Sequence, residues 1–274
     1  MYENYWQLTR KPFDNTSDPK FYYPSDAHQG ALLKLRYAIE NRRGGAVVSG
    51  AAGLGKSLLV NALFRQLPDR FQPRVHMVFP QMSTDELLAY LAEEFSGQSG
   101  TSAAPRSSDS SIRCIQEALR ENTEAGRHAV LAIDEAHLLQ EMGTLDTMRL
   151  ILNFEFESQP AVTLLLIGQP SLLANLDRMP GLEERLGVKC LLRPFTEDET
   201  VSYVSHRLTA AGANEMIFDQ DALEAIHALS LGVPRRINRL ADLALLIGFA
   251  EERTSVTAEQ IEAVSEELVT VKPE

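Results

Sequence analysis

The sequence predicts an α/β protein built on a doubly wound parallel sheet of five strands, with a small all-helical domain after it. Up to about residue 194, short apolar runs alternate with segments of helical period, which is the pattern of a parallel sheet covered by helices on both faces. Beyond that point no strand pattern remains, and apolar residues recur at helical spacing. The 274 residues, 44% of them hydrophobic, are enough for both parts.

The elements follow from these two periods. The expected strands are the apolar runs at 45–49, 75–79, 129–133, 162–167 and 188–192. The helices expected before and between them lie at 26–41, 58–67, 83–95, 111–126 and 144–157. The helices of the final domain are expected at 196–211, 219–230, 234–250 and 257–268. Pro234 suits the first helical position of its segment, and Thr257 with Gln260 forms a capping box.

We therefore expect three parts: an arm at 1–24, an α/β domain at 25–194 and a helical lid at 195–270. The arm contains prolines and many aromatic residues without a helical period, so an extended segment held by its rings is expected. Between about 96 and 111 the residues are mostly Ser, Gly and Ala. Such a composition buries too little apolar surface to become ordered, which indicates a mobile surface loop.

Charge and hydropathy restrict the class of function. The formal net charge is −12, so nucleic-acid binding would need a local basic patch acting against an unfavourable overall field. No apolar run approaches the roughly 20 residues of a membrane helix, and the N-terminus lacks the pattern of a signal peptide. The two cysteines have no ligand-like spacing. A cytoplasmic protein with nucleic acid as an improbable partner is the expectation.

A glycine-rich segment follows the first expected strand and precedes a helix. It reads Gly50-Ala-Ala-Gly-Leu-Gly-Lys-Ser57 and matches the P-loop pattern G-x-x-x-x-G-K-[ST]. Backbone N–H groups of such a loop wrap phosphates, and the helix N-terminus adds positive charge. Lys56 would bridge the β- and γ-phosphates of ATP, and Ser57 would bind Mg²⁺. The expected nucleotide-binding residues are Gly50, Ala51, Ala52, Gly53, Leu54, Gly55, Lys56, Ser57 and Leu58. The alternative is a glycine-rich turn with an exposed lysine.

Two carboxylates end the third expected strand. Burial of an acidic group at a strand end is costly unless it meets a cation or a hydrogen-bond network. Asp134 is therefore expected to hold the Mg²⁺ shell, and Glu135 to polarise the attacking water. The alternative is an acidic cap for the next helix. His137, two residues on, is expected to be a structural histidine rather than a base.

Gln169 follows the fourth expected strand and would emerge at the same sheet edge. An uncharged side chain there can contact the γ-phosphate and orient water without adding negative charge, which favours a nucleotide sensor. The alternative is a turn residue before Pro170.

Two arginines are candidates for contact with the phosphates. Arg235 begins a lid helix, where the helix dipole disfavours a cation, so a phosphate partner is indicated for its guanidinium. Arg235, Asn238 and Arg239 share one helix face. Arg185, on the short segment before the last strand, could reach a neighbouring subunit and neutralise charge on the transferred phosphoryl group. Arg178 is the second choice for that role. The alternative for Arg235 is a surface salt-bridge cluster, and the alternative for Arg185 is a solvated surface arginine.

With these motifs in one order, the chain resembles AAA+ ATPases of the general secretion pathway A (ExeA) type. The resemblance covers roughly residues 1–268. Further stretches that look like this family are Trp6-Gln-Leu-Thr-Arg-Lys-Pro-Phe13, Asp18-Pro-Lys-Phe-Tyr-Tyr23, Ile167-Gly-Gln-Pro170 and Ala210-Ala-Gly212. Two departures are that Ala51, Ala52 and Ser57 stand where relatives usually carry an acidic residue and threonine, and that no transmembrane or peptidoglycan-binding segment follows the lid. The chain thus looks like the short members associated with pili or exopolysaccharide export.

The resemblance implies an AAA+ fold, ATP and Mg²⁺ as cofactors, a homo-oligomeric ring with an arginine acting in trans, and an accessory role at an envelope machine such as a secretion system or type IV pilus. A partner protein at the inner membrane would recruit such a chain. Similar architectures regulate DNA transposition, for which the arginines of the lid helix, or Lys34, Arg36, Arg42 and Arg43, would have to form a basic patch. A third interpretation is a scaffold gated by ATP with little turnover, against which Lys56 and Glu135 both argue.

Overall fold

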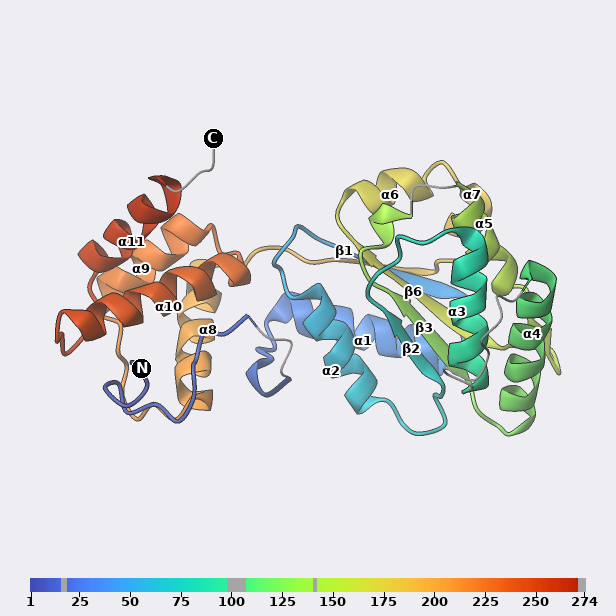
Figure 1. Ribbon diagram of the computed structural model, residues 1–274, viewed down its shortest axis with the longest axis horizontal. Helices are drawn as coiled ribbons and strands as arrows, with labels where there is room; N and C mark the ends of the chain where they lie inside the picture. The colour runs from blue at the N-terminus through green and yellow to red at the C-terminus, as the bar shows by residue number, and fades with distance from the viewer. Residues whose placement is uncertain (16–18, 98–106, 140–141, 271–274) are drawn as a thin grey trace. The chain divides into compact units, whose positions relative to one another are not determined.

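The computed structural model describes residues 1–15, 19–97, 107–139 and 142–270. The chain divides into two compact units (Figure 1). The sheet unit comprises residues 27–52 and 59–192, and the helical unit comprises 1–26, 53–58 and 193–274. Within the described ranges, no helix combines the length and the apolar character needed to cross a membrane.

The sheet unit contains the predicted five-stranded parallel sheet, and the predicted fold class is confirmed. Its strand order is β2-β3-β6-β1-β7. The strands are β1 (Gly45–Ser49), β2 (Arg74–Met77), β3 (Ala129–Ile133), β6 (Val162–Gly168) and β7 (Val188–Leu191). All four pairings between neighbours are parallel. Every residue of the three central strands β3, β6 and β1 is buried, as expected for a sheet with helices on both faces.

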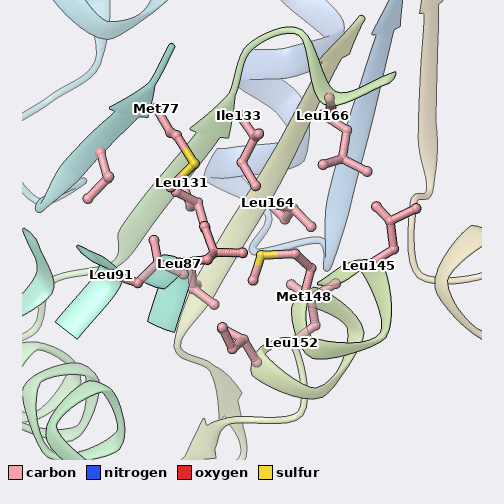
Figure 2. Packing of buried hydrophobic residues seen from close by; sticks show 14 of the residues in the cluster. Met77, Leu87, Leu91, Leu131, Ile133, Leu145, Met148, Leu152, Leu164 and Leu166 are labelled. Carbon is pink, nitrogen blue, oxygen red and sulfur yellow. The ribbon is translucent and has the colours of Figure 1, made fainter. Parts of the chain in front are cut away.

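The pleat sends alternate side chains to the two faces of the sheet. On one face, Leu131 and Ile133 of β3 pack with Leu164 and Leu166 of β6 against α3 (Thr84–Ser96) and α5 (Met142–Ile151), as Figure 2 shows. The amphipathic helix α4 (Ser108–Glu124) packs on α3. The sheet therefore has a buried, leucine-rich layer on this side.

The opposite face carries α1 (Asp26–Glu40) and α2 (Lys56–Gln66). His76, which alternates with Met77 on β2, makes an edge contact with the Phe64 ring of α2. Cys190 of β7 lies against the Ala31 carbonyl of α1, with its sulfur 4.0 Å from the oxygen. These contacts complete the doubly wound arrangement.

The segment after α5 differs from its predicted structure. The pattern predicts a helix through residue 157, but α5 ends at Ile151 and a hairpin follows, with β4 (Glu155–Phe156) paired to β5 (Gln159–Pro160). Glu157 and Ser158 both have positive φ, 51° and 61°, as a type I′ turn requires. The sequence lacks the Asn-Gly signal of such a turn, so its apolar residues looked like a continuation of the helix.

Smaller differences concern the edge of the sheet and two short helices. Strand β2 ends at Met77, and Val78 and Phe79 beyond it are exposed. Two helices that the sequence analysis did not expect, α6 (Ser171–Leu176) and α7 (Pro180–Glu183), connect β6 to β7. The mobile loop expected at about 96–111 falls largely on residues 98–106, outside the described residues; Ser96 ends α3, and α4 begins at Ser108.

The helical unit consists of α8 (Glu197–Ala210), α9 (Gln220–Ser230), α10 (Pro234–Ala250) and α11 (Ala258–Thr270). Pro234 occupies the first turn of α10, and the backbone N–H of Thr257 donates to the Gln260 side chain at 3.1 Å. The N-terminal segment belongs to this unit: Tyr2, Trp6 and Phe13 are buried in its core. A short helix, η1 (Pro19–Phe21), follows.

A buried arginine ties the N-terminal segment to α8. The Arg207 side chain is 2% exposed, and its guanidinium donates to the carbonyl oxygens of Pro12 and Asp14. It also lies over the Phe21 ring, 4.3 Å from the centroid. The cation is thus stabilised by carbonyl dipoles and a ring face, which offset part of its desolvation cost.

Candidate active site at the carboxyl edge of the sheet

Three neighbouring strands deliver the predicted polar residues to one edge of the sheet unit. Because β1, β6 and β3 are adjacent and parallel, their carboxyl ends meet there, and they lead into Gly50, Gln169 and Asp134 respectively. The Gly50 N–H donates to the Gly168 carbonyl oxygen at 3.2 Å, and the Asp134 N–H donates to that of Met77 at 2.8 Å. The start of the P-loop, the acidic pair and Gln169 therefore share an edge, as the sequence analysis predicted. Open α/β sheets bind ligands at this edge.

The P-loop conformation suits an anion. Gly53 and Gly55 have φ values of 84° and 83°, in the left-handed region that glycine adopts without steric cost. Lys56 begins α2 and is 5% exposed. Because the first N–H groups of a helix have no intrahelical acceptor, the N-terminus of α2 offers donors and the positive end of a dipole. These features fit the phosphates of a nucleotide.

Within the helical unit, the P-loop segment 53–58 contacts the start of α10. The Arg235 N–H donates to the Gly53 carbonyl oxygen at 3.2 Å. A Cβ atom added to Gly53 would lie 2.8 Å from the Arg235 Cβ and 3.2 Å from the Val233 Cγ1. The backbone of the loop and the predicted sensor arginine thus approach so closely that only glycine fits. The Arg235 side chain is exposed.

Asp134 and Glu135 leave β3 through a sharp turn. Asp134 is 4% exposed, and its Oδ1 accepts the Glu135 N–H at 2.9 Å. Glu135 adopts a left-handed conformation, with φ 49° and ψ 33°, which costs a non-glycine residue about 1–2 kcal/mol. The turn continues into η2 (Ala136–Leu138), where the Leu138 N–H donates to the Glu135 carbonyl oxygen at 2.8 Å. Strain of this kind is concentrated at functional sites.

His137 has two partners at one ring nitrogen. The backbone N–H of Gln169 donates to its Nδ1 at 3.4 Å, and the same atom lies 3.3 Å from Oε2 of Glu135. The bond to Gln169 joins η2 to the end of β6, in agreement with the expected structural role. The contact with the predicted catalytic glutamate was not expected.

His76 is a residue of this site that was not predicted from the sequence. This residue of β2 lies with its Nε2 3.8 Å from Oδ2 of Asp134, and that buried nitrogen has no hydrogen-bond partner in the part of the chain that the structure describes. A histidine between Val75 and Met77 in an apolar run was the one available signal. Its position near the site follows only from the pairing of β2 with β3, which places His76 beside Ala132, two residues before Asp134.

Arg185 lies at the opposite edge of the sheet from the acidic pair. It follows α7 and precedes β7, and a Cβ atom added to Gly44 would lie 2.9 Å from its carbonyl oxygen. Gly44 directly precedes β1, so Arg185 stands at the amino end of that strand, whereas Gly50 stands at the carboxyl end. Arg178 lies between α6 and α7. Arg185 is therefore not placed to serve the acidic pair of its own sheet.

The two basic clusters considered for nucleic acid differ in their partners. Arg36 is paired with Glu40 at 2.7 Å, Arg42 is bonded to the Gln159 side chain, and Arg43 lies over the Tyr37 ring. Arg235, Arg236 and Arg239 of α10 are exposed.

Asn238 does not share the exposure of these arginines. It is 5% exposed, its Oδ1 accepts the Tyr203 hydroxyl at 2.7 Å, and its Nδ2 donates to Asn15 at 2.9 Å. The expected common face of Arg235, Asn238 and Arg239 is wrong at Asn238, because hydrogen-bond partners in the core hold its amide.

Comparison with known proteins assigns this architecture to a family. A family model described as AAA domain matches residues 39–176. The sequence is 31% identical, over 282 residues, to General secretion pathway protein A of Aeromonas hydrophila. That match covers 100% of this chain and 50% of the relative, so the chain spans about half the relative's length.

Solved structures with a similar fold include ORC2 and Cdc6p proteins and a Holliday junction branch migration motor. The ORC2 protein of Aeropyrum pernix matches with a TM-score of 0.73 and 15% identity, covering 97% of this chain and 73% of its own. Cdc6p of Pyrobaculum aerophilum matches with a TM-score of 0.75 and 17% identity, covering 96% and 74%. The RuvB branch migration motor of Thermotoga maritima matches with a TM-score of 0.60 and 20% identity, covering 89% and 69%. At these identities the likeness shows the fold.

Proposed function

The chain belongs to the AAA family of P-loop proteins, and we propose that it binds ATP with Mg²⁺ and hydrolyses it to ADP and phosphate. The observation that carries this proposal is the convergence of Gly50, Gln169 and Asp134 at the carboxyl ends of adjacent parallel strands. The match over residues 39–176 includes all three. The relative from the general secretion pathway and the ORC2 structure, which was solved in complexes with ADPNP and ADP, support a nucleotide-binding protein.

Each residue has a proposed role that follows from its chemistry. The backbone N–H groups of 50–58 bind the phosphates, Lys56 supplies a cation to the β- and γ-phosphates, and Arg235 senses the nucleotide from α10. Ser57 and Asp134 provide oxygen ligands of the kind Mg²⁺ prefers. Bound Mg²⁺ neutralises charge that develops on the phosphate oxygens.

Hydrolysis needs a positioned water. Glu135, a carboxylate whose side chain is 41% exposed on a strained turn, accepts the hydrogen bond of this water and takes up its proton as the oxygen attacks the γ-phosphorus. Gln169 contacts the γ-phosphate and the water without adding charge. The bond from phosphorus to the bridging oxygen of ADP breaks, and ADP leaves with that electron pair.

We also propose that the active unit is a homo-oligomer in which Arg185 completes a neighbour's site. Its position at the amino edge of β1 leaves it far along the strands from the acidic pair of its own sheet. An arginine supplied in trans can stabilise charge on the transferred phosphoryl group.

The cellular role proposed is an accessory or assembly ATPase of a secretion, type IV pilus or exopolysaccharide export system, in the cytoplasm or recruited to the inner membrane by a partner. The relative named for the general secretion pathway supports it. A regulator of DNA transposition is the second candidate, but the net charge of −12 and the pairing of Arg36 with Glu40 disfavour it. Salt-dependent retention on duplex DNA with ATP would favour this second role.

Removal of the P-loop lysine tests nucleotide binding. Lys56→Ala should weaken ATP binding roughly 100-fold and stop turnover, because a charge-assisted contact contributes up to about 3 kcal/mol. Titration with a fluorescent ATP analogue measures it. The matched control is Lys189→Ala, which removes a surface ion pair with Glu183 and should bind as the wild type does. Unchanged affinity in Lys56→Ala would contradict the assignment of the P-loop.

A mixing experiment tests the arginine in trans. Arg185→Ala and Lys56→Ala should each be inactive alone, and their mixture should recover part of the ATP turnover, because a ring would then contain sites with one intact lysine and one intact neighbouring arginine. Equal activity of the mixture and of the separate variants would remove Arg185 from the proposal. The same mixture with Arg178→Ala distinguishes the two arginines.

A further inference from the structure

One imidazole nitrogen lies between the proposed base and the proposed sensor. Nδ1 of His137 is 3.3 Å from Oε2 of Glu135 and 3.4 Å from the backbone nitrogen of Gln169. The His137 side chain is 12% exposed, whereas that of Glu135 is 41% exposed. The imidazole is therefore held in the protein, and the carboxylate beside it reaches solvent.

The packing around η2 fixes the position of this imidazole. The 3-10 helix packs against β6 and α6. Gly168 permits the approach, since a Cβ atom there would lie 3.2 Å from the His137 backbone nitrogen and 3.0 Å from the Leu172 Cδ2. His137, Glu135 and the end of β6 thus pack closely together at the sheet edge that carries Asp134.

The two contacts of Nδ1 exclude each other. A neutral imidazole has one nitrogen that donates and one that accepts. When Nδ1 is unprotonated, its one lone pair accepts the Gln169 N–H, and Nδ1 then has no proton to donate to the nearby oxygen of Glu135. When Nδ1 carries the proton it donates to the Glu135 carboxylate, and the Gln169 N–H loses this acceptor. A change of tautomer exchanges the two partners without changing the net charge of the ring.

We propose that His137 is a positioning residue for Glu135, holding its carboxylate through Nδ1 and releasing it to the attacking water when Nδ1 bonds instead to the Gln169 backbone. The proposal rests on the role of Glu135 as the base. It links the two residues proposed to act on the γ-phosphate through one shared atom, so that a shift at the end of β6 changes the direction of the Glu135 carboxylate.

The first experiment compares replacements that keep or lose a polar atom at the Nδ1 position. Asparagine places its amide near Nδ1, whereas glutamine places it near Nε2. We expect His137→Ala and His137→Gln to lower kcat for ATP roughly 10- to 100-fold, since misplacement of a catalytic group by about 1 Å has this effect. His137→Asn should retain most of kcat. The KM for ATP and the thermal unfolding midpoint should stay near the wild-type values in all three.

Several outcomes would overturn the inference. They are a kcat of His137→Ala within twofold of the wild type, a rise in KM with unchanged kcat, or equal losses in His137→Asn and His137→Gln. The Glu135→Gln variant separates this failure from failure of the base assignment. If Glu135→Gln is inactive and His137→Ala is fully active, only the positioning role fails; if Glu135→Gln keeps full turnover, the base assignment itself fails.

A second measurement does not depend on turnover. The chain has six histidines, and the ¹⁵N resonances of His137 can be assigned by their loss in His137→Asn. Glu135→Gln should shift the Nδ1 resonance of His137, because the tautomer that donates to a carboxylate then has only a neutral amide oxygen as its acceptor. Glu183→Gln, which alters a surface carboxylate paired with Lys189, should not shift it. An unchanged chemical shift of His137 Nδ1 in Glu135→Gln would contradict both the contact with Glu135 and the proposed positioning role.

Discussion

The two units of this chain both bury polar side chains, but they hold them in different ways. In the sheet unit, Asp134 is buried at a strand end beside Glu135, which is strained and partly exposed. In the helical unit, Arg207 of α8 and Asn238 of α10 are buried, and their side chains donate to Pro12, Asp14 and Asn15 of the N-terminal segment. The first arrangement lies at a sheet edge where a ligand can bind. The second holds the N-terminal segment on the helices of its own unit and has a structural role.

The difference shows that burial of a polar group is a poor sign of function by itself. Backbone strain and partial exposure next to the buried group, as at Glu135, distinguish the candidate site. At Arg207 the neighbours are carbonyl oxygens and rings of the same unit, which is how a protein satisfies a buried cation. Substitutions in the two units should therefore separate stability from turnover.

The largest expected effect on stability is at Arg207, the buried side chain that ties the N-terminal segment to α8. Arg207→Ala should lower the free energy of unfolding of the helical unit by about 3–5 kcal/mol, because two carbonyl groups lose their donor and a void opens beside Phe21. Fluorescence of Trp6, the single tryptophan, buried in this unit, follows its unfolding in urea. Arg239→Ala on the exposed face of α10 is the control and should change stability by less than about 0.5 kcal/mol. Equal changes in unfolding free energy for Arg207→Ala and Arg239→Ala would contradict the structural role of Arg207.

A smaller effect is expected from one substitution made in both units. Gly232 has φ 67°, and a Cβ atom there would lie 2.1 Å from the Phe195 carbonyl oxygen. Gly126 of the sheet unit has φ 73° with no atom within 4 Å of such a Cβ. Gly232→Ala should cost about 2–4 kcal/mol from strain and overpacking together, and Gly126→Ala about 1 kcal/mol from strain alone.

Thermal unfolding followed by far-UV circular dichroism compares these two variants. The separation between them measures the close approach of the segment before α10 to the Phe195 backbone, whose N–H donates to the Gly232 carbonyl oxygen at 2.8 Å. Equal midpoints for the two variants would mean that the Phe195 backbone can move away from the added Cβ atom at little cost in free energy.

The sequence predicted the strands of the sheet more completely than it predicted the turns and the side-chain contacts of either unit. Runs such as Ala129–Ile133 are continuous, apolar and too short for a buried helix, so they were identified as buried strands, and β1 and β3 have the predicted bounds. The hairpin after α5 was missed because Glu157 and Ser158 adopt positive φ without the residues that usually signal it. The edge that gathers Gly50, Asp134 and Gln169 was predictable because strand ends follow from strand positions.

Contacts between distant segments could not be read from the sequence. No pattern in the segment 196–211 pointed to a special role for Arg207, because its partners Pro12 and Asp14 lie almost 200 positions away. His76 gains its neighbour Asp134 only through the pairing of β2 with β3. The proposed roles of Lys56, Glu135, Arg185 and Arg235 stay predictions until they are measured.

The most direct test of the central claim is the ATP turnover of Glu135→Gln with its nucleotide affinity measured on the same sample. Glutamine keeps the shape of the side chain but cannot accept the proton of the attacking water, so we predict unchanged ATP affinity and stability and a fall in kcat of about 100-fold or more. Turnover equal to that of the wild type would contradict the account of how this sheet edge hydrolyses ATP.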